Sequence, residues 1–129
     1  MSSVQNIIGA FVGLASLAWL FLVLPRLGRK HDAWERAYNA ACDAFERDRM
    51  DEAESRIRQA YRIAGEMEWR PHEPRALSAF ALAEVLQKTG RSEEAERRCR
   101  EAAELLRQGP VQGLEASEVA ELLGTIRSA

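Results

Sequence analysis

The stretch RMDEAESRIRQAYRIA, residues 49–64, is echoed by RSEEAERRCREAAELL at residues 91–106. Both stretches place two glutamates around an alanine and follow them with arginines and a second alanine, and 42 residues separate equivalent positions. Within each stretch, apolar residues recur three and four positions apart among charged ones, which indicates an amphipathic helix. A helix that occurs twice in a chain of 129 residues predicts a structural repeat, in which neighbouring units bury apolar faces that neither could bury alone.

The chain divides into two parts of different composition. It is 47% apolar and 29% charged overall, yet residues 1–25 carry no charge and all twenty acidic residues lie at or beyond Asp32. Arg26, Arg29 and Lys30 give residues 1–30 a formal charge of +3, which leaves −5 for the remainder of a chain whose net charge is −2. An acidic balance of this kind argues against a nucleic-acid partner.

Residues 7–24, IIGAFVGLASLAWLFLVL, form an apolar run that only Ser16 interrupts. Eighteen helical residues cover about 27 Å, which is enough to span the hydrocarbon of a bilayer. A cleaved signal peptide is the alternative, but such peptides carry positive charge before the apolar stretch and a small-residue cleavage site after it, and this sequence has neither. The run therefore predicts a single transmembrane helix that acts as a permanent anchor.

Pro25 is expected to end this helix, and the three cations that follow indicate its cytoplasmic end. Sixteen arginines against two lysines suggest a bacterial genome rich in GC. We therefore expect residues 1–30 to anchor the chain in a bacterial inner membrane, with the amino terminus outside and residues 31–129 in the cytoplasm.

Gly9 and Gly13 form a GxxxG pair, which lets another transmembrane helix approach closely. A chance spacing is the alternative, because glycine is common in membrane helices.

Trp34 lies beyond the basic cluster, where an indole could rest at the level of the headgroups. No histidine lies within the span, so the sequence offers no obvious axial ligand for a haem or chlorophyll there.

From Asp32 onward the pattern is helical and contains no convincing strand, which predicts an all-α fold behind the anchor. Gly90 is expected to end one helix and Ser92 to cap the next. Other breaks fall at WRPHEP, residues 69–74, and GPVQG, residues 109–113. The expected helices cover residues 32–47, 51–66, 74–89, 92–108 and 114–127.

Two helix pairs, at about 32–66 and 74–108, followed by a capping helix at about 114–127, resemble the tetratricopeptide repeat family. A generic helical bundle is the alternative. The second pair carries the small residues Ala83, Gly90, Ala95 and Ala102, and the first pair keeps Ala41, Ala53 and Ala60 but has Asp48 in place of the turn glycine. The offset of 42 exceeds the 34 residues usual in the family, and in this respect the chain is similar to the kinesin light chain type.

The resemblance implies a concave groove, lined by the first helix of each pair, that receives a peptide or a helix. Carried onto this chain, the groove residues are Glu35, Tyr38, Cys42 and Phe45 from one unit and Leu77, Phe80, Glu84, Gln87 and Lys88 from the other. Aromatic residues on a groove suit partner recognition. Phe45 and Phe80 could instead complete the core.

The sequence offers no convincing catalytic or metal site. Cys42, Cys99, His31 and His72 lack metal-ligand spacing, and two isolated cysteines fit free thiols better than a disulfide. EWRPHE, residues 68–73, gathers a tryptophan, an arginine, a histidine and two glutamates, but we interpret it as a polar loop whose edge Trp69 covers. We therefore expect a protein that is not an enzyme and binds no cofactor or metal.

These observations predict a membrane-anchored module that binds protein partners, either as an adaptor or as an assembly factor. The alternative is an accessory subunit of a respiratory, photosynthetic or secretion complex, whose transmembrane helix makes the main contact. The sequence itself does not identify the partner.

Overall fold

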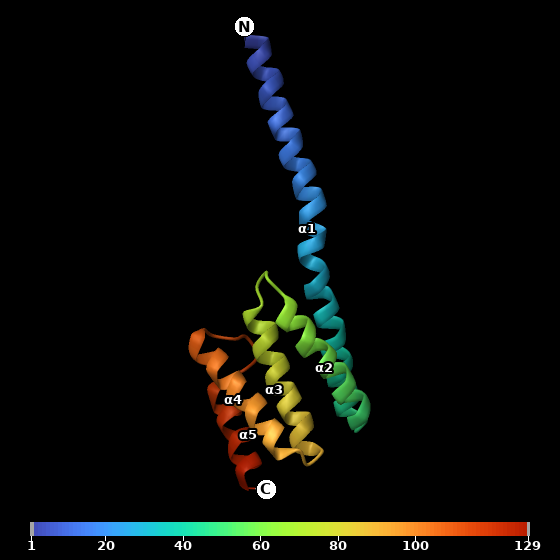
Figure 1. Cartoon of the computed structure of the whole chain (residues 1–129), viewed down its shortest axis with the longest axis vertical. Helices are drawn as coiled ribbons and strands as arrows, with labels where there is room; N and C mark the ends of the chain where they lie inside the picture. Colours follow the sequence, from blue (N-terminus) through green and yellow to red (C-terminus); the bar gives the residue numbers. More distant parts are fainter. Residues whose placement is uncertain (1, 129) are drawn as a thin grey trace.

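The computed structural model describes the backbone of residues 2–128 and the side chains of residues 17–22 and 28–128. Over this range the chain is all-α, as predicted, and its first helix projects far beyond the others (Figure 1). The five helices are α1 (Ser2–Glu46), α2 (Met50–Glu66), α3 (His72–Lys88), α4 (Ser92–Gln108) and α5 (Ala116–Ser128).

The helix α1 continues through Pro25, so the prediction that this proline ends a helix is wrong, as is the predicted helix start at Asp32. Proline removes one backbone hydrogen bond and disturbs one turn, at a cost of roughly 3 kcal/mol. Most of the five residues on each side are leucine, arginine or lysine, which favour helix. Two long helical runs can therefore join across the proline and leave no linker between the apolar segment and the repeats.

The predicted membrane span at residues 7–24 and the Gly9–Gly13 pair lie largely or wholly outside the residues whose side chains are described. Among the residues that are described, no helix has the length and apolar character needed to cross a membrane.

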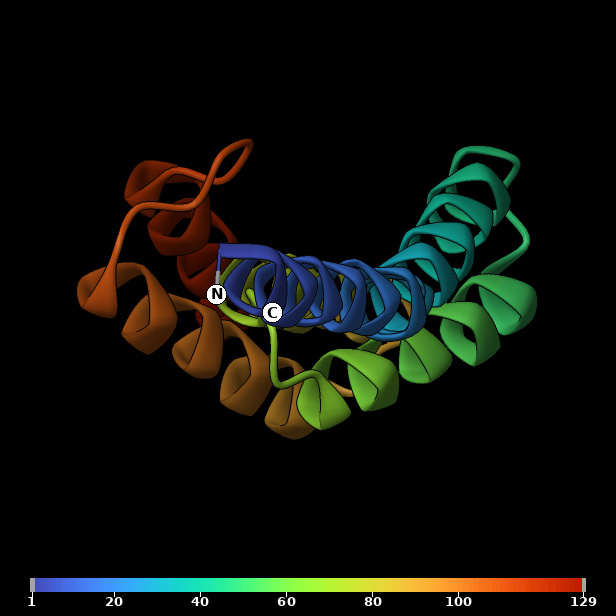
Figure 2. The ribbon, with the colours of Figure 1, turned by 90° about the horizontal axis from the view of Figure 1, so that it is seen from above.

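The helices form two antiparallel hairpins and one further helix. The carboxy-terminal half of α1 packs on α2, α3 packs on α4, and α2 also packs on α3, which joins the two hairpins. The last helix, α5, packs on α4. Viewed from above, α2 and α4 lie along the outer side of an arc, and the carboxy-terminal part of α1 and α5 lie at its two ends (Figure 2).

Small residues bring these helices close together. Ala53 and Ala60 of α2 and their equivalents Ala95 and Ala102 of α4 are all fully buried, so each repeated alanine lies where a larger side chain would separate two helices. Ile57 is also fully buried, and Cys99 occupies the equivalent buried position 42 residues later. Cys99 therefore acts as a small apolar residue, and both it and Cys42 are free thiols.

The two hairpins turn in the same way. Asp48 and Gly90, at equivalent positions, both have positive φ, at +61° and +80°. The next residue in each turn donates its N–H back to a helix carbonyl over 2.9 Å, from Arg49 to Ala44 and from Arg91 to Leu86. Gly90 thus ends α3 as predicted. Ser92 does not cap α4, because it is the first helical residue and Arg91 precedes it without a side-chain cap.

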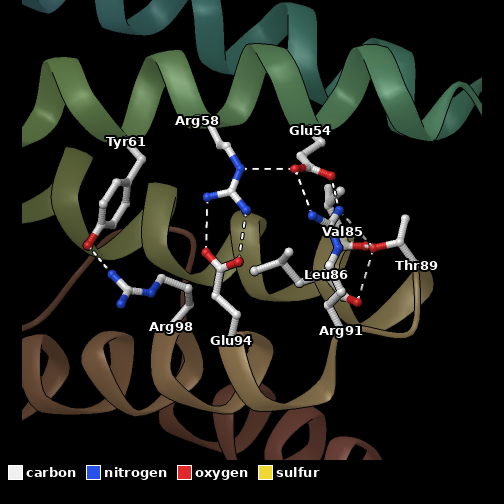
Figure 3. Close-up of polar contacts among 9 residues, drawn as sticks. All are labelled: Glu54, Arg58, Tyr61, Val85, Leu86, Thr89, Arg91, Glu94 and Arg98. Carbon is white, nitrogen blue, oxygen red and sulfur yellow. Dashed lines mark hydrogen bonds and ion pairs between the residues drawn. The ribbon is translucent and has the colours of Figure 1, made fainter.

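The repeated charged residues make equivalent ion pairs in the two copies of the segment. Arg58 donates Nε to Glu54 over 3.0 Å, and four residues apart in the second copy Arg100 donates to Glu96 over 2.8 Å. Each glutamate also accepts an arginine from farther along the chain: Glu54 from Arg91 at the start of α4 (Figure 3), and Glu96 from Arg127 in α5. Each copy therefore ties its own helix to the next unit.

Candidate binding groove

The inner side of the arc carries a hollow of about 160 Å³ between α1 and α3. Its wall is mainly apolar and aromatic, with a carboxylate from each of the two helices. Four of the predicted groove residues, Tyr38, Cys42, Phe45 and Glu84, line it together, and the other lining residues are Ala41, Glu46, Ile57, Ala81 and Val85.

Tyr38 is held in place from the core side by Trp34. The two rings stack with centroids 5.1 Å apart, and the Trp34 indole donates Nε1–H to Ser78 Oγ over 2.7 Å, a bond buried between α1 and α3. Trp34 is only 6% exposed, so the suggestion that it rests at the headgroup level is wrong. Its partner lies 44 residues away in the sequence, and the amino-acid pattern around it gives no sign of that contact.

The hollow lowers the acidity of the groups that line it. Burial raises the pKa of the Tyr38 hydroxyl and of the Cys42 thiol, and the negative charge of Glu84 raises both further. Burial also raises the pKa of the Glu84 carboxyl, with a smaller contribution from Glu118 on α5. A thiol with a raised pKa is a poor nucleophile at neutral pH, so this arrangement suits binding rather than covalent chemistry.

The remaining predicted groove residues lie elsewhere on α1 and α3. Phe80 and Leu77 are half-buried and pack against the core. Gln87 is half-buried, Lys88 is exposed, and neither lines the hollow. Phe45 lines the hollow and also packs against the core. A place in the groove and a place in the core are therefore not exclusive for this side chain.

A second, more open hollow of about 600 Å³ adjoins the first along α1. Tyr38 lines both, and Glu35 from the predicted groove lines the second with Trp34. Its other wall comes from the loop between α2 and α3 and the start of α3, including Arg70, His72 and Glu73. The sequence predicts only a polar loop at residues 68–73, because nothing in the spacing of these residues shows that the loop faces α1.

One group of side chains has the ligand types of a metal site. His31, Asp32 and Glu35 lie on neighbouring turns of α1, with one potential ligand atom from each within 4.8 Å of the others. Asp32 and Glu35 are exposed to solvent and His31 is half-buried. Exposed acidic groups of this kind are common on helix surfaces without any ion, so the cluster by itself does not define a metal site.

Comparisons with known proteins identify no relative. No protein-family model matches the chain, and searches of curated proteins and of solved structures also found no match.

Proposed function

We propose that this protein is a membrane-anchored module of the tetratricopeptide type that binds a segment of a protein partner in the groove between α1 and α3, and that it is not an enzyme. The observation that carries the proposal is the hollow on the inner side of two stacked hairpins, with its wall of Tyr38, Cys42 and Phe45. Aromatic anchors in such a groove commonly supply much of the binding energy of a partner.

The anchor is supported by α1 itself. The apolar run from residue 7 to residue 24 is long enough to span a bilayer, and it lies on the part of α1 that projects beyond the other helices (Figure 1). Leu17, Trp19, Leu20, Phe21 and Leu22 are between 40% and 79% exposed. Contiguous exposed apolar surface of this kind marks a membrane or protein contact. The cations Arg26, Arg29 and Lys30 favour a domain on the cytoplasmic side of a bacterial inner membrane.

A second function is supported by the same exposed stretch. Side chains from Leu17 to Leu22 can pack against other membrane helices, and Gly9 with Gly13 provides a strip for close approach. In this alternative the protein is an accessory subunit of a membrane complex, and the repeats stabilise the assembly from the aqueous side.

The two functions are separated by blocking each surface in turn in the full-length protein. Ala81→Arg places a long side chain in the hollow, and Gln59→Arg adds the same group to the exposed outer face of α2 as the matched control. Gly9→Leu with Gly13→Leu fills the glycine strip. Each variant is purified from membranes in a gentle detergent and examined by native electrophoresis together with its bound partners.

Loss of a partner with Ala81→Arg but not with Gln59→Arg supports the adaptor. Loss only with the glycine variants supports the accessory subunit. A protein that migrates alone in all forms contradicts both.

A further inference from the structure

The hollow between α1 and α3 has the size of one side chain. Pockets that bind small molecules usually enclose about 300 to 1,000 Å³, whereas this one encloses about 160 Å³. A cavity of about 150 Å³ in another protein holds one benzene molecule. The hollow therefore suits a single side chain of a partner segment that lies along the groove.

The charged groups at the hollow are acids, and the described part of the chain gives them no basic partner. Glu84 and Glu46 line it, and the negative charge of Glu118 reaches Glu84 from α5. No lysine, arginine or histidine within the described residues lies within ion-pair distance of Glu84 or Glu46.

Three carboxylates on the outer face, by contrast, are paired with arginines. Glu94 accepts both terminal nitrogens of Arg58, over 2.9 and 3.0 Å, and Glu54 and Glu96 each accept two arginines. The hydrogen bonds from Arg58 hold the pKa of the Glu94 carboxyl below its usual range, whereas burial raises the pKa of the Glu84 carboxyl. Glu54, Glu94 and Glu96 are thus paired with arginines of the chain itself, whereas Glu84 and Glu46 have no such pair among the described residues.

We propose that the hollow receives a lysine or arginine side chain of the bound segment, with its aliphatic part between Tyr38 and Phe45 and its cationic end on Glu84 and Glu46. This inference rests on the proposed binding groove and names the chemistry of its partner. Lysine and arginine have a long apolar stem and a charged end, which matches the apolar wall and acidic groups of the hollow. The Tyr38 ring adds a face on which a cation is attracted.

Folding has already removed part of the water around Glu84, so the partner does not have to do so. A pre-organised acceptor of this kind increases the selectivity for a cation over an uncharged side chain of equal length. Hydrogen bonds to charged groups are worth enough to give about a 10- to 100-fold preference. The cationic class follows from Glu84 and Glu46, and an apolar occupant is the result that would contradict it.

The test uses the full-length protein in lipid nanodiscs and four synthetic 14-residue peptides based on alanine and serine with leucine along one helical face. The peptides differ only at one central position, which is lysine, arginine, norleucine or glutamate. Binding is measured by fluorescence anisotropy, and nanodiscs without protein set the background. Glu84→Gln removes the charge while keeping the shape, and Glu93→Gln makes the same change at an exposed position of α4 as the control.

We expect the lysine and arginine peptides to bind about 10- to 100-fold more tightly than the norleucine peptide. Glu84→Gln should abolish that preference, and Glu93→Gln should preserve it. If the norleucine peptide binds as tightly as the lysine peptide, and Ala81→Arg blocks both, the groove is right and the cationic partner is wrong. If no peptide binds, or Ala81→Arg blocks none of them, the groove itself is contradicted.

Discussion

The two turns at Asp48 and Gly90 allow a direct test of the repeat. Both residues hold a positive φ, a conformation that costs an ordinary residue roughly 1 to 2 kcal/mol and costs glycine almost nothing. A Cβ added at Gly90 has no other atom within 4 Å, so Gly90→Ala introduces backbone strain and no clash. Alanine also lowers the conformational entropy of the unfolded chain, which stabilises the folded state by about 0.4 to 1 kcal/mol. We therefore expect a net loss of about 1 kcal/mol in the free energy of unfolding.

The opposite exchange at Asp48 provides the matched control. Asp48→Gly relieves strain, but the freer unfolded chain offsets the gain, so we expect a change within about 0.5 kcal/mol. Asp48→Ala keeps the strain and loses a side chain that tolerates this conformation better than alanine does, so it should destabilise the protein. Thermal unfolding of the full-length protein in a mild detergent, followed by circular dichroism, measures all three. For a domain of this size, 1 kcal/mol corresponds to about 4 to 8 °C in Tm.

Gly90→Ala with the Tm of the parent would show that the turn does not hold a left-handed residue. A large loss with Asp48→Gly would show that the Asp48 side chain, rather than its backbone conformation, stabilises the first turn. Either result would contradict the equivalence of the two hairpins.

Three further outcomes are expected. Ala95→Leu should destabilise the protein by about 1 to 3 kcal/mol in the same unfolding assay, because Ala95 is fully buried and overpacking displaces both helices; equal stability would argue against a close helix contact there. Trp34→Phe should cost about 1 to 3 kcal/mol because it leaves the buried Ser78 hydroxyl without its donor, and combining it with Ser78→Ala should recover part of that loss in a double-mutant cycle. A cysteine at Ser3 should react with an impermeant maleimide added to intact cells while one at Ser128 should not, with the unmodified chain as the control for Cys42 and Cys99; the reverse labelling would overturn the cytoplasmic domain.

The sequence predicts the helices because their pattern is local. The repeated phrase marks α2 and α4, and Gly90 marks the end of α3. The error at Pro25 has a physical reason: a proline removes one hydrogen bond wherever it occurs, but whether the helix continues depends on the stability of the turns on both sides. That balance cannot be obtained from the proline alone.

The candidate site is only partly predictable for a different reason. Tyr38, Cys42 and Phe45 lie on one face of one helix, so helical spacing and the family resemblance are enough to group them. The contact between Trp34 and Ser78, and the approach of Arg70 and His72 to α1, depend on how two hairpins are placed. The raised pKa of the Glu84 carboxyl likewise depends on its burial and on the approach of Glu118 from α5, which a single stretch of sequence does not encode.

The unbroken helix α1 fixes where each proposed surface meets its partner. With residues 7–24 in the bilayer and α1 along the membrane normal, Tyr38 and Phe45 stand about 21 and 32 Å beyond Leu24, at 1.5 Å per residue. The headgroup layer extends only about 5 to 8 Å from the hydrocarbon, so the proposed anchor would place the hollow in the aqueous phase and Leu20 within the lipid. A photo-crosslinker at Phe45 therefore captures a partner of the adaptor, and one at Leu20 captures a neighbour within a membrane complex. The two proposed functions make contact at different heights along a single helix, so the position that crosslinks identifies which of them operates.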